Sequence, residues 1–269
     1  MKASSISPRA SRASIVELLM MGDTLRTDLE SVDLAAALEA GNAVAETEAK
    51  FAVPVETARN IIAVGLNYRE HTKETNLEAP TTPLLFAKWA SSLAGPHTPI
   101  ALDSSISKQV DYEVELAVVI GKRTLDVTAA EALDHVAGYT VSNDISARDV
   151  QFAEAQWTRA KSFDGFCPIG PWLTSADAVP NPQLLQLSCS INGERKQNGN
   201  TSQMVFGVAD IIAFASRSLT LLPGDIILTG TPSGVAMGAE VPRWLRPGDI
   251  LRSEIEGLGV LENAMVARA

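Results

Sequence analysis

The chain has 269 residues, of which 46% are hydrophobic and 20% are charged, the composition of an ordinary globular protein. With 22 Lys and Arg against 32 Asp and Glu, its formal net charge is −10, which argues against nucleic acid and anionic membranes as partners. This length allows a sizeable core without disulfide or metal staples, because long chains bury a large share of their surface on folding.

The first 55 residues predict a small N-terminal segment. Residues 1–12 are rich in Ser, Ala and Arg without periodicity, so we expect them to be mobile. Ala and Leu at helical spacing predict a helix over 33–50. The apolar run at 14–22 contains Glu17 and lacks a small-residue cleavage site, so it does not predict a signal peptide.

Residues 56–269 predict one large β-rich domain. Apolar runs bounded by Gly, Pro, Asn and Asp are typical of strands and lie at 60–68, 83–89, 114–121, 136–144, 184–193, 225–232 and 249–255. Pro-Gly-Asp at 223–225 and at 247–249 predicts two tight turns that each lead into a strand. Helical spacing of apolar residues predicts a helix over 202–221. Many strands and few helices favour a mainly β (α+β) fold, a mixed β-sandwich roll, over a doubly wound α/β fold.

The run VDYEVELAVVIGK, residues 110–122, predicts a strand with three carboxylates on one face. Asp111, Glu113 and Glu115 are each two residues apart, and a strand sends alternate side chains to the same side. The run continues without polar residues to Gly121, which indicates burial on both faces, where unpaired carboxylates are costly. A solvated face of an edge strand is the alternative.

A fourth carboxylate, Asp144, ends the apolar run 136–144. Hard cations such as Mg²⁺, Mn²⁺ and Ca²⁺ prefer carboxylate oxygens, and Mg²⁺ usually takes only a few of them from protein. The Cα atoms of Glu113 and Glu115 would lie about 7 Å apart, so their long side chains could close on one ion. From spacing alone, a metal site and a solvated polar face both remain open.

The segment GLNYREHTKE, residues 65–74, carries a candidate general base. Gly65 and Asn67 indicate a turn after a strand, and His71 and Glu74 would share one face of a helical turn. A carboxylate that binds an imidazole raises its basicity and fixes its tautomer, which suits the activation of water. A surface turn in which the two side chains never meet is the alternative.

Two further stretches suggest polar groups near a pocket. Lys161 lies among Phe, Cys and a Gly-Pro turn in RAKSFDGFCPIGPW, so its ammonium could neutralise a substrate carboxylate or a developing enolate. It could equally be a solvated lysine, and nothing upstream specifically supports a Schiff-base role. Backbone N–H groups of the loop LTGTPSGV, residues 228–235, could hold a carboxylate, although a tight β-turn explains the same residues.

Seven motifs resemble, in the same order, those of the fumarylacetoacetate hydrolase family. They are VGLNYREHTKE, FAKWASSLAGP, DYEVELAVVIGK, GYTVSNDISARDVQ, QWTRAKSFDGFCPIGPWL, NGERKQNGNTSQMVFGV and LLPGDIILTGTPSGV, and they lie between residues 60 and 235. One such motif would be weak evidence, but seven in order are specific for the family.

The resemblance implies a mixed β-sandwich roll, usually dimeric, with an acidic divalent-metal site. Matched onto this sequence, the metal ligands would be Glu113, Glu115 and Asp144. The ion would be Mg²⁺ or Mn²⁺, with Ca²⁺ less suited. His71 and Glu74 match the family's water-activating pair, on a segment that becomes ordered when substrate binds.

Further residues match the family's substrate site. Lys161 matches a lysine near the metal and the substrate, and Thr231, next to Gly230, matches the residue that holds the substrate's carboxylate. Arg148 and Gln151 lie in the stretch that forms the pocket.

Some positions depart from the family pattern or lie outside its ligand set. Asp111 matches no ligand, and we expect it to support the site from outside. Lys88-Trp89 stands where the family commonly has Lys-Pro, which we expect to reshape one pocket wall. Cys167 is expected in the core and not as a nucleophile. The first 55 residues do not clearly match the family's small β-rich leader.

The implied chemistry centres on a 2-oxo acid that chelates the metal. The metal would then stabilise the enolate that forms when the adjacent C–C bond breaks. Water delivered by His71 and Glu74 makes hydrolysis of a 2,4-dioxo acid, such as an acylpyruvate, the leading hypothesis. Decarboxylation of oxaloacetate or isomerisation of a 2-hydroxy-diene dioate could use the same site. A non-catalytic metal-binding protein and a Schiff-base lyase using Lys161 are the alternatives from other classes.

The expected partner is a small 2-oxo or 2,4-dioxo acid, and the expected assembly is a homodimer. The only cysteines are Cys167 and Cys189, which favours a reducing compartment. No run of about 18 apolar residues predicts a membrane span. We therefore expect a cytoplasmic enzyme that binds neither nucleic acid nor membrane.

Overall fold

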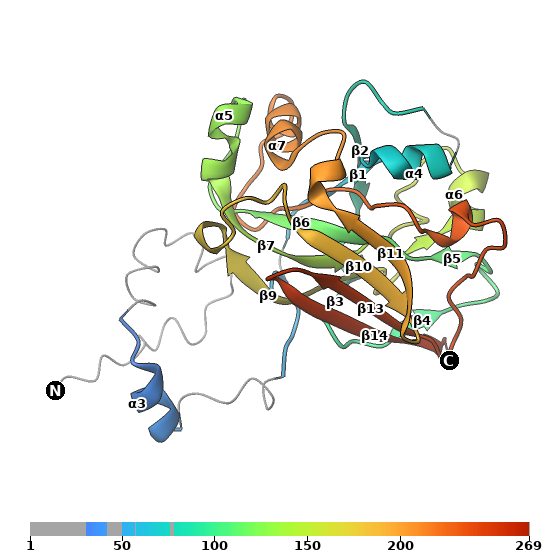
Figure 1. Ribbon diagram of the computed structural model, residues 1–269, viewed down its shortest axis with the longest axis horizontal. Helices are drawn as coiled ribbons and strands as arrows, with labels where there is room; N and C mark the ends of the chain where they lie inside the picture. The colour runs from blue at the N-terminus through green and yellow to red at the C-terminus, as the bar shows by residue number, and fades with distance from the viewer. Residues whose placement is uncertain (1–30, 42–49, 57, 76–77, 269) are drawn as a thin grey trace.

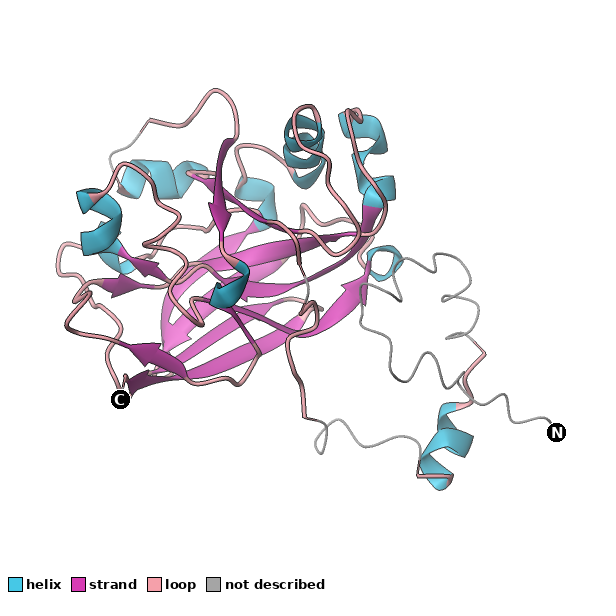
Figure 2. Ribbon diagram, turned by 180° about the vertical axis from the view of Figure 1, so that it is seen from behind, coloured by secondary structure: helices cyan, strands magenta, loops and turns pink. Residues whose placement is uncertain are grey.

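The computed structural model describes residues 31–41, 50–56, 58–75 and 78–268. Two large sheets face each other across one core, and short helices lie around their edges (Figures 1 and 2). The stretch expected to be mobile, residues 1–12, lies outside the described residues. So do residues 42–49 of the expected helix, whose described part contains α3 (Leu34–Glu39).

The seven-stranded sheet has the order β2-β1-β12-β6-β7-β9-β3. Its strands are β1 (Ile61–Gly65), β2 (Leu84–Lys88), β3 (Leu93–Ala94), β6 (Val114–Ile120), β7 (Val136–Asn143), β9 (Cys167–Ser175) and β12 (Ile226–Leu228). β6 is buried along its whole length, as its apolar sequence predicted. β1 and β12 run parallel, with Ile61 opposite Ile226, although these residues are far apart in the chain.

The five-stranded sheet has the order β11-β10-β13-β14-β4. Its strands are β4 (Ile100–Leu102), β10 (Gln186–Ile191), β11 (Glu194–Asn200), β13 (Ile250–Ile255) and β14 (Gly259–Ala267). Leu187, Leu251 and Leu261 belong to the same buried cluster as Leu116 and Val118 of β6. Burying each such side chain contributes about 1.5–3 kcal/mol, so this interface holds β6 firmly in place.

The remaining elements are short. They are α4 (Arg69–Glu74), α5 (Ala129–Ala132), α6 (Arg148–Ala153), α7 (Val208–Ser216), the 3₁₀ turns η3 (Ala90–Ser92), η4 (Leu133–His135), η5 (Ala176–Ala178), η6 (Thr201–Gln203) and η7 (Ala236–Gly238), and the paired strands β5 (Val110–Asp111) and β8 (Ser146–Ala147). α5 and α7 lie together at one end of the sheets, and α4 and α6 lie at the other end (Figure 1). Among the described residues, no helix is long and apolar enough to cross a membrane.

The outer face of the seven-stranded sheet is also covered. Val55 and Ala58 pack there against Ile61, Val119 and Ile226. The chain just before β1 therefore contributes to this core, whereas the division of the chain at residue 55 stays a prediction.

Both predicted Pro-Gly-Asp turns are confirmed. The N–H of Asp225 donates to the carbonyl of Leu222 at 2.9 Å, and the N–H of Asp249 donates to the carbonyl of Arg246 at 3.0 Å. The glycine of each turn has a positive φ, 87° and 96°, a conformation that glycine adopts without steric cost. β12 and β13 begin directly after these turns.

The strand expected over 110–122 is interrupted, so that prediction was wrong in one respect. β5 ends at Asp111 and pairs with β8, whereas β6 begins at Val114. The N–H of Tyr112 donates to the carboxylate of Asp111 at 2.8 Å, and the N–H of Glu113 donates to an asparagine side chain at 2.9 Å. These local bonds replace ladder bonds to a neighbouring strand, so Asp111 does not share one strand face with the two glutamates.

The helix expected over 202–221 is also shorter, since α7 covers only Val208–Ser216. The cause is Asn67, which approaches from β1. Its side-chain oxygen accepts the N–H of Phe206 at 2.8 Å, and its carbonyl accepts the N–H of Val205 at 2.8 Å. These bonds to a distant residue keep the two positions out of the helix.

Candidate active site

Three carboxylates converge where β6 and β7 pair. The antiparallel register sets Val114 opposite Asn143, so Glu113 and Asp144 face each other just beyond this pair. The N–H of Asp144 donates to the carbonyl of Glu113 at 2.8 Å. Glu115 lies two residues further along β6. All three side chains are buried, and one oxygen of each lies within 4.8 Å of those of the other two.

Two buried lysines neutralise part of this charge. The Nζ atom of Lys161 lies 2.8 Å from Oε2 of Glu113 and 2.7 Å from Oδ2 of Asp144. The Nζ atom of Lys88 lies 2.5 Å from Oδ1 of Asp144 and donates to the carbonyl of Phe166 at 3.1 Å. Because these pairs are shielded from solvent, their attraction is stronger than that of surface pairs.

Arg148, the first residue of α6, holds Glu113 from another side. Its Nη2 donates to Oε1 of Glu113, its Nε donates to Oδ2 of Asp111 at 2.9 Å, and its Nη1 donates to Oε1 of Gln151 at 2.9 Å. The bond to Gln151 fixes the orientation of that amide, because its oxygen faces the guanidinium. The NH₂ group of Gln151 is then available to the pocket.

These neighbours push the pKa values of the two glutamates apart. Burial alone would raise the pKa of Glu113, but Lys161 and Arg148 outweigh burial and hold this pKa well below its usual value. Burial, together with Asp144 and Glu113, raises the pKa of Glu115 well above its usual value. Burial alone would lower the pKa of Lys161, but the carboxylates of Asp144 and Glu113 raise it, so the ammonium stays protonated.

Glu115 is the carboxylate left without a cation. The buried carboxylates around the cluster are Asp111, Glu113, Glu115 and Asp144. The buried cationic side chains are Lys88, Arg148 and Lys161. Within the described part of the chain, Glu115 makes no ion pair, and its Oε2 accepts the N–H of Gly230 at 2.7 Å. A buried carboxylate without a positive partner is costly, so the cluster lacks one cation.

The donor set fits a hard divalent cation. Glu113, Glu115 and Asp144 would hold the ion, and they offer only oxygen, the ligand atom that Mg²⁺ and Mn²⁺ prefer. Mg²⁺ usually keeps several waters among its six ligands, whereas Ca²⁺ takes six to eight oxygens, so a set of three carboxylates suits Mg²⁺ better. When bound, such an ion polarises the oxygens of a 2-oxo acid and stabilises negative charge that develops on them. The acidic cluster expected from the sequence is present, and the identity of the ion stays a prediction.

His71 and Glu74 meet on α4, as their spacing predicted. Nδ1 of His71 lies 3.5 Å from Oε2 of Glu74, at the outer limit of a hydrogen bond. The N–H of Gly234 donates to both carboxylate oxygens of Glu74, at 2.9 Å and 3.1 Å. With Glu74 at Nδ1, the second ring nitrogen Nε2 is left for a partner in the pocket.

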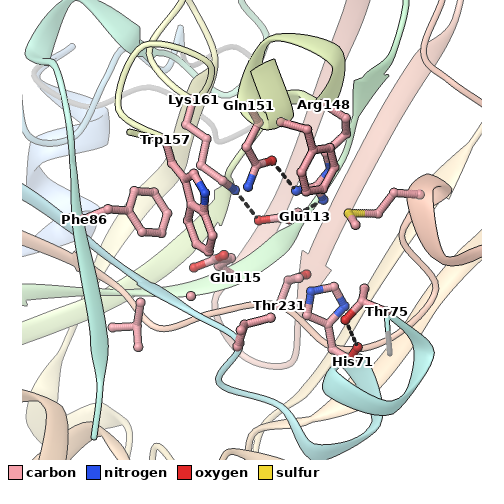
Figure 3. A pocket seen from close by; sticks show the side chains of 15 residues that line it. His71, Thr75, Phe86, Glu113, Glu115, Arg148, Gln151, Trp157, Lys161 and Thr231 are labelled. Carbon is pink, nitrogen blue, oxygen red and sulfur yellow. Dashed lines mark hydrogen bonds and ion pairs between the residues drawn. The ribbon is translucent and has the colours of Figure 1, made fainter. Parts of the chain in front are cut away.

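One pocket, partly open to solvent, is bordered by His71 of this pair and by Glu113 and Glu115 of the acidic cluster (Figure 3). Its polar lining consists of His71, Thr75, Glu113, Glu115, Arg148, Gln151, Lys161 and Thr231. Phe86 and Trp157 form an aromatic wall, with their ring centres 5.5 Å apart in an edge-to-face arrangement. The Nζ atom of Lys161 lies 5.2 Å from the ring centre of Phe86. The pocket therefore combines a charged floor with an apolar wall.

Gly230 and Thr231, expected to bind substrate, are engaged inside the protein. The hydroxyl of Thr231 donates to the carbonyl of Val114 at 2.9 Å and accepts the side-chain N–H of Gln197 at 2.8 Å. A hydroxyl has one hydrogen, so this one has none left for a substrate carboxylate. The N–H of Gly230 donates to the carboxylate of Glu115. The substrate-binding role of both residues stays a prediction.

Two contributors to the site were not expected from the sequence. Lys88 ends an apolar strand, and a lysine in that position is the signal that could have pointed to a buried acidic partner. Trp157 precedes Lys161 by one turn, and the N–H of Lys161 donates to the carbonyl of Trp157 at 3.1 Å. This turn places both side chains at the pocket.

Two further expectations have different outcomes. Trp89, expected to reshape a pocket wall, is 54% exposed and is not among the residues that line the pocket. That prediction was wrong, because only the lysine of the Lys88-Trp89 pair points inward. Cys167 is buried, and burial raises its pKa to about 11, which agrees with a place in the core and not with a nucleophile.

The comparison with known families matches the geometry. The model of the fumarylacetoacetate (FAA) hydrolase C-terminal domain matches residues 60–266. The chain belongs to this family. The human protein named oxaloacetate tautomerase FAHD2A, mitochondrial, is 47% identical over 222 residues, which cover 82% of this chain and 70% of that protein.

Solved structures of the same family share the fold. A protein from Mycobacterium smegmatis, provisionally assigned as HpcE, superposes with a TM-score of 0.85 at 38% identity and covers 94% of this chain and 88% of its own. The 2-hydroxyhepta-2,4-diene-1,7-dioate isomerase from Mycobacterium marinum gives a TM-score of 0.71 at 40% identity, covering 81% of this chain and 78% of its own. The mainly β fold expected from the resemblance to the fumarylacetoacetate hydrolase family is therefore confirmed.

Proposed function

We propose that this chain is a divalent-metal-dependent enzyme that moves a proton between the enol oxygen and the neighbouring carbon of a small 2-oxo dicarboxylate, with oxaloacetate as the first substrate to test. The observation that carries this proposal is that the His71–Glu74 pair and the Glu113–Glu115–Asp144 cluster adjoin a single pocket. The human relative named oxaloacetate tautomerase and the isomerase from Mycobacterium marinum support this reaction class.

Each side chain has a task in this reaction. Glu74 faces Nδ1 of His71, so Nε2 can accept the enol hydroxyl proton and return it to the adjacent carbon. The substrate keeps all its atoms, and only the position of one proton changes. Gln151, oriented by Arg148, offers N–H donors to a substrate carboxylate. The aromatic wall of Phe86 and Trp157 limits the length of the substrate and keeps water away from it.

The charge of the pocket supports a dianionic substrate. When Glu115 is ionised, the buried side chains around the cluster carry one more negative than positive charge. A divalent cation would reverse this sign and make the pocket attractive to a dicarboxylate. The metal is therefore expected to control substrate affinity as well as chemistry.

Hydrolysis of a C–C bond in a 2,4-dioxo acid is the second candidate. The same His71–Glu74 pair could activate a water molecule instead of holding a substrate proton. The aromatic wall argues for a shorter substrate than an acylpyruvate with a long acyl chain. Decarboxylation of oxaloacetate needs no water and stays a third outcome of the same test.

The Schiff-base alternative has little support. The ammonium of Lys161 donates to Glu113, to Asp144 and to the hydroxyl of Ser146 at 2.8 Å. A protonated amine with three acceptors has no lone pair with which to attack a carbonyl.

The test offers enol-oxaloacetate to the purified full-length protein loaded with Mg²⁺ or Mn²⁺. The ultraviolet absorbance of the enol should decay faster than in the same buffer with EDTA-treated protein. Pyruvate released from oxaloacetate and from an acylpyruvate is measured in parallel. Faster enol decay without pyruvate supports the proposal. Pyruvate from the acylpyruvate would establish hydrolysis in its place, and pyruvate with CO₂ from oxaloacetate would establish decarboxylation. No turnover of either substrate would favour the non-catalytic alternative.

A further inference from the structure

Asp111 is fully buried, does not itself line the pocket and belongs to no ligand set. Its two carboxylate oxygens accept four hydrogen bonds. Oδ1 accepts the N–H groups of Tyr112 at 2.8 Å and Ala236 at 2.7 Å, and Oδ2 accepts the N–H of Met237 at 3.1 Å and Nε of Arg148 at 2.9 Å. One carboxylate thus joins three separate parts of the chain.

The first of these parts leads to the general-base pair. The loop that follows β12 donates the Ala236 and Met237 N–H groups to Asp111. Two residues earlier, the N–H of Gly234 in the same loop holds both oxygens of Glu74. The loop is therefore fixed at one point by Asp111 and fixes Glu74 at the next. A shift of the loop would change the angle at which Glu74 meets His71.

The second part leads to the metal cluster. Nε of Arg148 donates to Asp111, and its two remaining nitrogens donate to Glu113 and Gln151. Since a guanidinium is planar and rigid, holding it at Nε fixes the direction of the other two nitrogens. Asp111 therefore orients one metal ligand and one candidate substrate donor through a single arginine.

We propose that Asp111 is a positioning residue that couples the His71–Glu74 pair to the metal cluster, through the 234–237 loop on one side and through Arg148 on the other. The part that concerns the general base rests on the proposed function. This coupling predicts that one substitution at Asp111 disturbs both the His71–Glu74 pair and the metal cluster, which do not contact each other.

The test compares two buried aspartates of the same kind. Asp111→Asn places an amide N–H where Met237 and Arg148 now donate, so these bonds are lost. Asp249→Asn is the matched control, because Asp249 is also buried and accepts from the Arg243 guanidinium and from a backbone N–H, at a turn away from the pocket. Both variants are studied as full-length protein, with Mn²⁺ alone as the probe for calorimetry and with metal-free protein for NMR.

Two readouts separate positioning from general stability. The dissociation constant of Mn²⁺, measured by titration calorimetry, should rise about 10- to 100-fold in Asp111→Asn, as for loss of other residues that orient metal ligands. The imidazole resonances report the position of His71 in the His71–Glu74 pair, and they are simple to assign because the chain has only 3 histidines. The His71 signal, assigned by its absence in His71→Gln, should shift in Asp111→Asn. Neither quantity should change in Asp249→Asn.

Two further variants test the connection through the loop and the connection through Arg148 separately. They also replace Asp111→Asn if that variant does not fold. Ala236→Pro removes one bond between the loop and Asp111, at the first position of a 3₁₀ turn whose preceding residue, Val235, has ψ 152°, so proline fits this backbone. It should shift the His71 signal and leave the affinity for Mn²⁺ unchanged. Arg148→Gln should weaken Mn²⁺ binding, and adding Asp111→Asn to it should weaken binding no further, because both act through one path.

The proposal is overturned by any of three results. Folded Asp111→Asn could bind Mn²⁺ with the affinity of the unmodified chain. Ala236→Pro could leave the His71 signal where it is. The losses in Mn²⁺ affinity of Asp111→Asn and Arg148→Gln could add in the double variant. Neither readout uses a substrate, so failure of the oxaloacetate assay with normal Mn²⁺ and His71 responses would reject the proposed function and keep the coupling.

Discussion

The metal cluster and the α4 segment border the same pocket, but they are built differently. Glu113 lies directly before β6, Glu115 lies on it and Asp144 directly follows β7, and all three have exposed fractions of 5% or less. His71 and Glu74 lie on a six-residue helix without a side-chain N-cap bond, and 3.5 Å separates their facing atoms. Glu74 keeps 19% of its side chain exposed and, besides its contact with His71, accepts the backbone N–H of Gly234.

The difference matches the two tasks. An ion site gains from rigid ligands in a dry environment, because each displaced ligand costs binding free energy. A proton-transfer pair must meet a substrate that enters and leaves, so it needs an exposed edge and some freedom to adjust. We therefore expect substitutions in the core to remove metal binding, and substitutions around α4 to remove turnover alone.

The largest effect is expected for Glu113→Ala. It removes a metal ligand and breaks the buried ion pairs of Glu113 with Lys161 and Arg148, and breaking a buried pair typically costs about 3–5 kcal/mol of folding free energy. Mn²⁺ binding and turnover should both be lost, as measured by calorimetry and by the enol assay. Glu194→Ala, on an exposed strand position, is the control. Retained Mn²⁺ affinity in Glu113→Ala would reject the assigned ligand set.

His71→Ala should give the next largest effect, because it deletes the group that moves the proton. Turnover should fall by about 10²–10⁴-fold, while the Mn²⁺ dissociation constant stays unchanged. His97→Ala, at an exposed histidine outside the pocket lining, should behave like the unmodified chain. Turnover at the normal rate in His71→Ala would show that another group transfers the proton.

Gly238→Ala should disturb the His71–Glu74 pair as well, with a smaller loss of turnover than His71→Ala. A Cβ atom there would lie 2.3 Å from Cγ of Glu74, so that side chain must move. Because small misplacements of a catalytic group cost rate, turnover should fall about tenfold or more at constant Mn²⁺ affinity. Gly207→Ala, where the nearest atom would lie at 3.4 Å, is the control. Equal rates in the two variants would argue against a fixed role for Glu74.

The smallest effect concerns the stability of the metal-free protein. The pKa of Glu115 is raised on folding, so its contribution to stability is complete below about pH 4.5 and is lost as the pH rises through the folded-state pKa. Thermal unfolding with EDTA should therefore show a melting temperature that falls over this range, and Mn²⁺ should restore it. Glu115→Gln should remove that slope and raise the melting temperature near neutral pH by about 2–4 °C, the change expected for 1 kcal/mol. An unchanged slope in Glu115→Gln would mean that another group is responsible.

Much of the architecture could be predicted because it depends on local pattern. The apolar run of β6 and the turns before β12 and β13 are properties of short segments, and the structure contains them. The pairing of His71 with Glu74 needed only helical spacing. The convergence of Glu113 and Glu115 on Asp144 was implied by family resemblance, whereas the spacing left a solvated face equally open.

The remaining features arise from contacts between distant segments. Lys88 lies 56 residues from Asp144, so no local pattern reveals their ion pair. The break between β5 and β6 and the short α7 both result from polar side chains that bond backbone groups elsewhere, as Asn67 does with Phe206. Local propensity cannot anticipate such competition, because it is decided only when the sheets are assembled.

The parallel pairing of β1 with β12 also affects when the candidate site is completed during synthesis. Ile61 and Ile226 meet only after the intervening chain has been made, and closing so long a loop is slow. α4 follows β1, and the loop that holds Glu74 follows β12, so the contact between Glu74 and Gly234 depends on this pairing. A nascent chain that has not yet released β12 and the following loop from the ribosome therefore has no complete site. We expect the contact between Glu74 and Gly234 to form only after the chain through Gly234 has left the ribosome.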